Sequence, residues 1–576
     1  GSGANSIVAF CLNITDVDPL ELDLYFERFI NPHRSSPPDF DIDFSWDERD
    51  DLIDYIFKRY GRAHTALLAT YNTFKGRSII RELGKVFGLP KSEIDRIVED
   101  PLKTENHHPL ARQIIHYGNQ LSGFPNYLSI HAGGIIISEA PIFGYTALDM
   151  MPKGFPITHF DMYHAEQIGF HKFDVLSQRG LGHLKDAVEL IRNNRGKEVD
   201  IHRVEKIKAD VRVRKLLRSG KCMGCFYIES PAMRGLLQKL RCEDYVHLVA
   251  ASSIIRPGVA SSGMMREYIR RFHAPETIRY IHPTFEQHLG ETFGVMVYQE
   301  DVMKIVHHFA GLDLDESDVL RRIMSGKKYR SDTFTRLRQK FFDNCKYRGY
   351  SEELTNEVWR QIESFSGYSF CKAHSASFAV ESFQSLYLKA YYPLEFMVAV
   401  INNFGGFYKS EFYFHEARMS GATIMAPCVN HSHYLTTIEG DTIYIGLIHL
   451  NQMERKLAHE LVGQRARNGT FRSLEDFVCR VSATSEQLDI LIRIGAFRFT
   501  GKNKYELMWE KNALLHAKSI PGFGATLFGE ESENFILPDL EEGPFDQAFD
   551  EIELLGFPLC SPFSLVVSQD CSACIE

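Results

Sequence analysis

The sequence has no apolar run as long as the roughly 18 residues of a membrane-spanning helix, so we expect no transmembrane segment. It also has no excess of basic residues, because 65 Lys and Arg stand against 75 Asp and Glu, a formal net charge of −10. That balance argues against a protein whose whole surface binds nucleic acid. Local basic patches are compatible with it, because the distribution of charge matters more than the sum.

Closely spaced cysteines are scarce. Of the eleven cysteines, only Cys222-x-x-Cys225 and Cys571-x-x-Cys574 have the spacing of a zinc-ligand pair, and they are far apart in the chain. Free thiols in a reducing cytoplasm are therefore the better interpretation. Internal repeats and low-complexity tracts are lacking too. With 576 residues, 44% hydrophobic and 24% charged, the composition is that of a soluble globular protein. A chain of this length predicts roughly three to five domains.

The most informative stretch is 38–44, Pro-Asp-Phe-Asp-Ile-Asp-Phe, which alternates strictly and therefore predicts a β-strand. One face would carry Asp39, Asp41 and Asp43, and the other would be aromatic and branched. Adjacent carboxylates repel one another unless a cation lies between them, and hard divalent cations prefer such oxygen ligands. A solvated acidic sheet face is the alternative, and for an isolated Asp-x-Asp pair it would be preferred.

A second alternating stretch follows at 169–176. Read as a strand, it places Phe170, Lys172 and Asp174 on one face. Such a strand could add a third carboxylate to a metal site and a cation for a phosphate, whereas an ordinary exposed ion pair is the alternative. Elsewhere we expect a short helix within 20–34 that is followed by a turn at Asn31-Pro32, a helix over 73–87, a helical tendency over 91–120 and a β-rich run over 127–143. The residues Ser45–Glu48 form the pattern of a capping box, which predicts that a helix follows the aspartate strand directly.

Beyond residue 180 the pattern is mainly helical, and it contains a local excess of basic charge. Residues 320–350 hold ten Lys and Arg against two Asp, a composition that suits a polyanion. A solvated helix face is an equally good interpretation from composition alone. In contrast, 529–556 holds ten acidic residues and no basic one, which predicts a linker or an acidic surface.

Taken together, these stretches closely resemble the C-family DNA polymerases, the family of the catalytic subunit of bacterial DNA polymerase III. The family's order and approximate spacing are kept from residue 1 to about 410. The matching runs are Gly1–Ala4, Phe26–Pro32, Pro38–Phe44, Lys172–Asp174, Ile255–Gly258, Tyr298–Met303, Leu320–Arg322 and Lys372–Ala376.

The resemblance implies an α+β fold built on a polymerase-beta-like nucleotidyltransferase palm. The implied domains are a palm (1–70 and 129–179), an inserted thumb (71–128), mainly helical fingers (180–410), a helix-hairpin-helix and clamp-binding region (411–530), and an acidic linker leading into a further domain (531–576). It implies template-directed addition of deoxynucleotides to a primer 3′-hydroxyl, with two Mg²⁺ ions as cofactors. Primer-template DNA and deoxynucleoside triphosphates would be the partners, in the cytoplasm at the nucleoid.

The resemblance also implies roles for individual residues. The metal ligands would be Asp39, Asp41 and Asp174. The residues near the incoming nucleotide would be Gly1, Ser2, Arg28, Arg34, Lys172, Arg256, Arg322 and His374. The DNA-contacting residues of the basic stretch would be Arg321, Lys327, Lys328 and Arg330.

The sequence departs from the family pattern in several places. The match lacks the family's N-terminal histidinol-phosphatase-like domain and its C-terminal oligonucleotide-binding and loader-binding regions, so sites for a clamp loader and a proofreading subunit are not expected. Residues Leu447–Asn451 stand where a glycine-rich hairpin is usual. Residues 525–528 resemble the end of a sliding-clamp peptide, which makes Leu527 and Phe528 candidate clamp contacts; a linker with two apolar anchors is the alternative.

Four functional hypotheses follow. A replicative DNA polymerase leads, and an error-prone translesion member of the same family is its close rival. A catalytically silent DNA-binding scaffold is disfavoured by the intact carboxylates and Lys172. A template-independent nucleotidyltransferase is disfavoured by the long helical region and its basic stretch.

Overall fold

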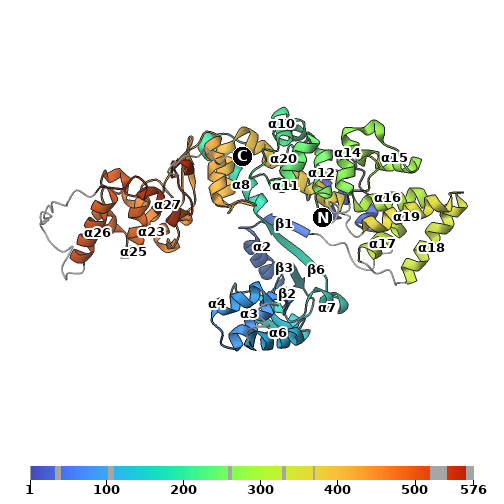
Figure 1. The fold of residues 1–576 in the computed structure, drawn as a ribbon, viewed down its shortest axis with the longest axis horizontal. Coiled ribbons are helices and arrows are strands. Elements are labelled where there is room, and N and C mark those ends of the chain that lie inside the picture. Colours follow the sequence, from blue (N-terminus) through green and yellow to red (C-terminus); the bar gives the residue numbers. More distant parts are fainter. Residues whose placement is uncertain are drawn as a thin grey trace. The chain divides into compact units, whose positions relative to one another are not determined.

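The computed structural model describes residues 2–32, 41–101, 109–256, 263–326, 332–366, 370–518 and 541–565. The chain divides into two compact units. Unit 1 comprises Gly1–Gly3 and Ser35–Gln178, and unit 2 comprises Ala4–Arg34 and Arg179–Glu576. The fold is α+β, with the main sheet in unit 1 and a predominantly helical unit 2 (Figure 1).

Unit 1 is built on a six-stranded sheet with the order β1-β6-β3-β2-β5-β4. The strands are β1 (Asp41–Ser45), β2 (Thr65–Thr73), β3 (Pro125–Ile137), β4 (Leu148–Met150), β5 (Pro156–Thr158) and β6 (Lys172–Gln178). The pairs β1–β6 and β2–β5 are parallel, whereas β6–β3, β3–β2 and β5–β4 are antiparallel. Both strands predicted around the aspartates are therefore confirmed.

The alternation of side chains along β2 explains why helices cover both faces of this sheet. Leu67 and Ala69 pack with Ile53 and Phe57 of helix α2 (Arg49–Tyr60) on one face. Ala66 and Leu68, on the opposite face, pack with Ala165 of helix α7 (Met162–Gln167). Each face has its own apolar core.

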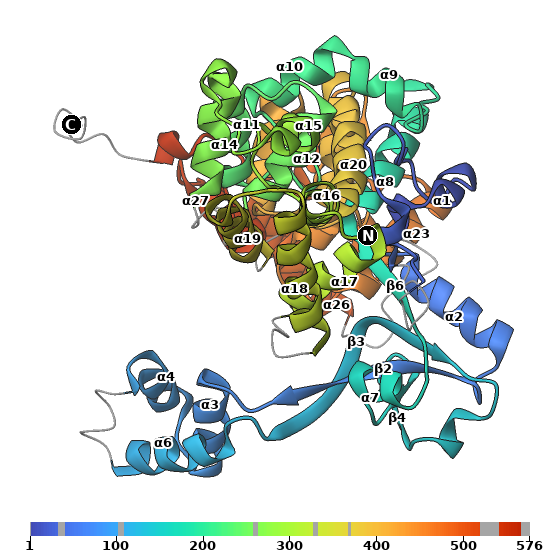
Figure 2. The ribbon, with the colours of Figure 1, turned by 90° about the vertical axis from the view of Figure 1, so that its right-hand side faces the viewer.

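An insertion between β2 and β3 forms a small helical subdomain. The two strands extend beyond the sheet to helices α3 (Arg77–Val86), α4 (Lys91–Glu99) and α6 (Pro109–Leu121), as Figure 2 shows. These helices share a core of their own around Ile97, Ala111 and Ile114. The position of this subdomain in the chain corresponds to the predicted thumb.

Two local predictions are wrong. The short helix predicted at the start of 20–34 is not formed: the described part of this segment contains only a 3₁₀ turn, Phe26–Arg28. Its leucines recur with a period of two rather than 3.6, so they do not form a helical stripe, and Asp23 adopts a left-handed φ of 48°. The predicted helix directly after the aspartate strand is confirmed as α2 (Arg49–Tyr60), but Ser45 is not its N-cap: Ser45 is the last residue of β1 and bonds to Asp47, while Glu48 precedes α2 without a side-chain cap.

Unit 2 has two large apolar cores. The first surrounds α20, whose side chains are buried on nearly all sides, and the second joins α15 to α19. The longer helices of this region are α8 (Arg179–Arg195), α10 (Val211–Ser219), α11 (Pro231–Leu240), α12 (Tyr245–Ile254), α14 (Met264–His273), α15 (Pro283–Leu289), α16 (Gln299–Ala310), α17 (Leu314–Ser325), α18 (Asp332–Tyr347), α19 (Glu352–Ser366), α20 (Lys372–Tyr391), α21 (Pro393–Asn402) and α22 (Ser410–Met419).

After α22, the described residues of unit 2 form a small sheet and a further group of helices. The strands are β7 (Thr423–Met425), β8 (Thr437–Glu439) and β9 (Thr442–Tyr444). The helices are α23 (Arg455–Asn468), α24 (Leu474–Arg480), α25 (Ser485–Arg493), α26 (Lys504–Lys518) and α27 (Asp546–Leu555). Among the described helices, none combines the length and the hydrophobicity that a bilayer crossing demands.

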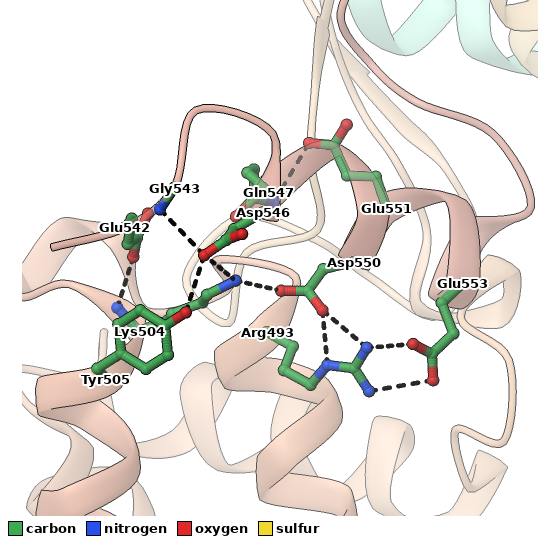
Figure 3. Close-up of polar contacts among 10 residues, drawn as sticks. All are labelled: Arg493, Lys504, Tyr505, Glu542, Gly543, Asp546, Gln547, Asp550, Glu551 and Glu553. Atoms are coloured by element: carbon green, nitrogen blue, oxygen red, sulfur yellow. Dashed lines mark hydrogen bonds and ion pairs between the residues drawn. The ribbon is translucent and has the colours of Figure 1, made fainter. Parts of the chain in front are cut away.

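Helix α27 corrects the prediction of an acidic linker over its part of the chain. Asp550 and Glu551 are each only 7% exposed, and Arg493 of α25 donates to Asp550 and pairs with Glu553. Lys504 of α26 also reaches Asp550, at 2.8 Å (Figure 3). The acidic composition is therefore that of a helix docked on a basic face, and not of a solvated linker.

Candidate active site

The register between β1 and β6 brings two of the predicted metal ligands together. The strands run parallel, and Asp41 is the direct partner of Asp174. Side chains of directly paired residues point to the same face of a sheet, so the two carboxylates lie side by side. Asp43, two residues along β1, shares this face. Residues 133 positions apart in sequence thus form one acidic cluster on a rigid sheet.

The carboxylate of Asp174 is buried and incompletely satisfied. Its side chain is 7% exposed, and its Oδ2 accepts from Nζ of Lys172 on the same strand. Its Oδ1 is buried and has no hydrogen-bond partner among the described residues, a costly arrangement for a charged acceptor. Nearby, burial raises the pKa of Asp43, and the charge of Asp41 contributes to the same effect.

Glycine keeps the space beside Asp174 open. A Cβ at Gly133 would lie 3.3 Å from Asp174 Oδ1 and 2.6 Å from Leu176 Cδ2, so any larger residue would crowd the carboxylate. The backbone of β3 at these glycines is held by His131, whose Nδ1 accepts from the N–H groups of Gly133 and of Gly134. Burial and the charge of Lys172 lower the pKa of His131, which favours the neutral acceptor form.

These features fit a hard divalent cation. A buried acceptor without a partner, a neighbouring carboxylate and an opening kept clear by glycine are what such an ion requires. The described residues contain no group of three side chains that could hold a metal. Asp39 lies outside them, so only two members of the predicted triad are seen.

Sequence reasoning missed two residues that shape this site, His131 and Arg49. Arg49, the first residue of α2, donates to the carbonyl of Val175 on β6 at 2.9 Å and to the carbonyl of Ala132 on β3 at 2.7 Å. Arg49 therefore links β6, which carries the buried carboxylate, to the neighbouring strand β3. No pattern in the sequence marks an arginine 83 and 126 residues from its two acceptors.

Of nine other predicted residues, one is described by the structure and eight are not. Ser2 begins a 3₁₀ helix, Ser2–Asn5. Gly1, Arg34, Asp39, Lys327, Lys328, Arg330, Leu527 and Phe528 lie outside the described residues.

In unit 2, three of the predicted cations share one polar cluster. Arg28 and Arg321 both donate to Oε1 of Gln299, at 2.8 and 3.1 Å. Arg321 also holds Oδ1 of Asp318 at 2.7 Å, and Arg322 holds Oδ2 of the same carboxylate at 2.7 Å. The arginine side chains differ in access, since that of Arg321 is 5% exposed and that of Arg322 is 37% exposed.

This burial argues against the predicted DNA contact of Arg321. Its guanidinium is used within the protein, and burial and the charge of Arg28 lower its pKa. Other cations of the basic stretch are also engaged internally: Lys340 pairs with Glu316, and Arg348 donates to two backbone carbonyls. The exposed members on α18 include Arg336 and Lys346.

Arg256 and His374 meet on a group of aromatic rings that we call the aromatic shelf, formed by Tyr227, Phe370, His374 and Phe378. The guanidinium carbon of Arg256 lies 3.4 Å from the centroid of the Phe370 ring, and its Nη2 donates to the Tyr227 hydroxyl at 3.1 Å. His374 lies 5.0 Å from Phe370 and 4.2 Å from Phe378, between centroids. Nε of Arg256 is buried and has no hydrogen-bond partner within the described ranges.

The aromatic shelf includes two residues that sequence reasoning missed. Phe378 lies four residues after His374 on α20, and this helical spacing could have revealed it. Tyr227 could not have been found in this way, because it comes from a loop and adopts a left-handed φ of 67°. Its ring centroid lies 5.0 Å from that of Phe378, which completes the shelf.

The hairpin segment Leu447–Asn451 has an interior role. Leu447 and Leu450 are buried, and Leu447–His449 is a 3₁₀ turn. Burial lowers the pKa of His449 to about 4, so it is neutral at physiological pH. An apolar sequence at this position therefore packs the local core.

Comparison with known proteins agrees with this geometry. Residues 1–177 match the model of the bacterial DNA polymerase III alpha NTPase domain, and residues 180–349 match that of the finger domain of the same subunit. Residues 421–507 match a helix-hairpin-helix motif. Together the first two matches extend over more than half of the chain.

Individual relatives agree as well. The DNA polymerase III subunit alpha of Aquifex aeolicus (strain VF5) is 32% identical over 602 residues, which cover 97% of this chain and 51% of the relative. That of Staphylococcus aureus (strain COL) is 32% identical over 529 residues, covering 88% of this chain and 49% of the relative. The chain thus spans about half the length of these relatives. The protein belongs to the bacterial DNA polymerase III alpha subunit family.

Proposed function

We propose that this chain catalyses template-directed DNA synthesis of the replicative type, adding deoxynucleotides to a primer 3′-hydroxyl with release of pyrophosphate. The observation that carries the proposal is the pairing of Asp41 with Asp174 across two parallel strands, with Lys172 beside them. Membership of the polymerase family supports the same reaction.

The residues that would hold two Mg²⁺ ions are Asp41 and Asp174, with Asp39 as the predicted third ligand. The chemistry supplied by two such ions is activation of the primer hydroxyl and stabilisation of the charge on the leaving pyrophosphate. The strand register fixes the two carboxylates before substrate arrives, so little reorganisation is needed. Lys172 holds a positive charge next to this pair, where it would face the triphosphate.

Arg256, Arg322 and His374 are the proposed contacts to the incoming nucleotide from unit 2. Arg256 has a fixed guanidinium plane, stacked on Phe370, with one hydrogen bond to Tyr227. A planar guanidinium can bind phosphate oxygens bidentately, so fixing its plane favours one orientation of the triphosphate. Base pairing with the template would select which nucleotide is added.

Primer-template DNA is the proposed macromolecular partner, with exposed cations of α18 such as Arg336 and Lys346 among its backbone contacts. A sliding clamp is a further proposed partner, through Leu527 and Phe528. The reaction would take place in the cytoplasm at the nucleoid, where the template is found.

Primer extension with Mg²⁺ and four deoxynucleotides tests the proposal. The wild-type chain should extend a primer on a defined template, and Asp41→Asn and Asp174→Asn should each slow extension by about 10³-fold or more, because each removes a ligand. Asp51→Asn, on the exposed first turn of α2, is the matched control and should extend normally. DNA binding, measured by fluorescence anisotropy, should change little in all three. Normal extension by Asp41→Asn would remove this residue from the catalytic centre.

A further inference from the structure

The turn that joins α21 to α22 exposes several large aromatic side chains. Phe404 is 44% exposed, Phe407 is 62% exposed and Phe412 is 45% exposed. Tyr408 links the last two, with ring centroids 5.2 Å from Phe407 and 5.8 Å from Phe412. We call these four residues the aromatic corner. Because these rings are largely exposed, their burial does not stabilise the turn. Its conformation must therefore be stabilised by other interactions.

A buried polar network holds the turn rigidly. The carboxylate of Glu229, which is 9% exposed, accepts from the backbone N–H of Phe407 at 2.5 Å and from the Tyr413 hydroxyl at 3.0 Å. The Tyr413 oxygen in turn accepts from the N–H groups of Gly406 and Tyr408, at 2.9 and 3.1 Å. Three backbone N–H groups of one short turn are thus fixed by two buried side chains.

The two glycines of the turn are required for this packing. A Cβ at Gly405, which has a φ of 61°, would lie 2.4 Å from Cε2 of Tyr413, and one at Gly406 would lie 2.0 Å from Oε1 of Glu229. Phe404 itself adopts a φ of 62°, a left-handed conformation that bulky residues rarely accept. Strain of this kind, together with a ring left in solvent, is typical of a binding site.

Exposed cations lie at the aromatic corner, whereas the carboxylate of Glu229 is buried against the turn. The guanidinium of Arg179 lies over the Phe404 ring, 5.8 Å from its centroid, and Lys409 is exposed within the turn. Neither cation forms an ion pair in the part of the chain that the structure describes. Glu411 follows in the first turn of α22, but Glu416 is held inward by Lys389 at 2.8 Å.

We propose that the aromatic corner binds single-stranded nucleic acid. Exposed rings beside unpaired cations match the two needs of an unpaired strand, since its bases stack on aromatic faces and its phosphates require positive charge. A duplex does not offer the same fit, because its bases are already stacked on one another. The residues of the aromatic corner belong to unit 2, whereas Asp41 and Asp174 belong to unit 1, and the proposed binding does not depend on the chemistry of these carboxylates.

Binding of a fluorescein-labelled (dT)₃₀ oligonucleotide, measured by anisotropy without nucleotides or metal, tests the proposal. Phe404→Ala with Phe407→Ala should weaken this binding by about 10-fold or more, since each stacked base is worth that much on aromatic platforms. Affinity for a blunt duplex of equal length should stay the same. Phe549→Ala on α27 is the matched control, because its ring is 63% exposed, and it should bind both probes normally.

Phe407→Trp tests the same contact without removing a ring. It should retain (dT)₃₀ affinity, and the new tryptophan fluorescence should be quenched by stacked bases. Unchanged (dT)₃₀ binding by the double alanine variant would overturn the proposal and would point to a protein partner. An equal loss of affinity for the blunt duplex would also overturn it. Repeating the binding measurement with Asp41→Asn keeps the result independent of the proposed catalytic activity.

Discussion

Removing one hydroxyl group from the aromatic shelf should weaken nucleotide binding while leaving the fold intact. In Tyr227→Phe the ring keeps its packing against Phe378, but the 3.1 Å hydrogen bond from Arg256 Nη2 is lost. Arg256 keeps its stacking on Phe370, so we expect its guanidinium to remain in place but to be less fixed in orientation.

The magnitude follows from the type of bond that is lost. A hydrogen bond with a charged partner is worth about 1.5 kcal/mol or more, and the lost orientation of Arg256 should reduce triphosphate affinity by a similar amount. That free energy corresponds to about a 10-fold increase in the Kd of the incoming deoxynucleotide. The maximal rate of incorporation should change little, because the substitution leaves the proposed metal ligands Asp41 and Asp174 unchanged.

Single-nucleotide incorporation, followed by rapid quench over a range of deoxynucleotide concentrations, separates the two quantities. Tyr391→Phe is the matched control, because it removes a hydrogen bond of 2.7 Å to Asp210 at another place in unit 2. The control should keep the wild-type Kd. An unchanged Kd in Tyr227→Phe, or an equal increase in Tyr391→Phe, would refute the reasoning.

Three further predictions concern stability. His183 is buried, with neither ring nitrogen hydrogen-bonded, and burial and the charge of Arg179 lower its pKa to about 4 from 6.5. Its neutral form therefore contributes about 3 kcal/mol to the free energy of unfolding above pH 6.5, and this contribution is lost as the pH falls toward 4. His183→Leu should flatten the pH dependence of urea unfolding over this range. Arg321→Ala should destabilise the fold by about 3 kcal/mol, because a buried ion pair loses one partner. Arg322→Ala should cost under about 1 kcal/mol of stability and chiefly weaken nucleotide binding. Equal decreases of the melting temperature in the two variants would contradict this prediction. Arg493→Ala should release α27, detected as faster amide hydrogen exchange over 546–555, and unchanged protection there would exclude the docking role.

Much of the acidic sheet face could be predicted from the sequence, because local patterns determine it. Alternation over 38–44 and 169–176 predicted both strands, and β1 and β6 confirm them. The pairing of Lys172 with Asp174 follows from their two-residue spacing on one strand, which places both side chains on the same face. Phe44 joins the core as expected, although Ile42 stays 42% exposed.

Other features depend on contacts between residues distant in sequence, which local patterns do not contain. The basic stretch predicted DNA contacts, but Arg321 is buried because Asp318 and Gln299 accept its hydrogen bonds. The acidic segment predicted a linker or an acidic surface, but its described part contains α27, which is docked because Arg493 and Lys504 meet its carboxylates. Whether a charged side chain faces solvent depends on its partner, and the partner is chosen by the fold.

The sequence by itself determined the strands, their acidic face and the family. Only the tertiary structure decided that Asp41 stands beside Asp174, since strand order and register come from packing two helices and a core around the sheet. It also decided that Tyr227 holds Arg256 and that the turn after α21 keeps its phenylalanines in solvent. The physical reason is that backbone geometry and alternation act over a few residues, whereas hydrogen-bond partners and burial are set by segments that meet only in the folded chain.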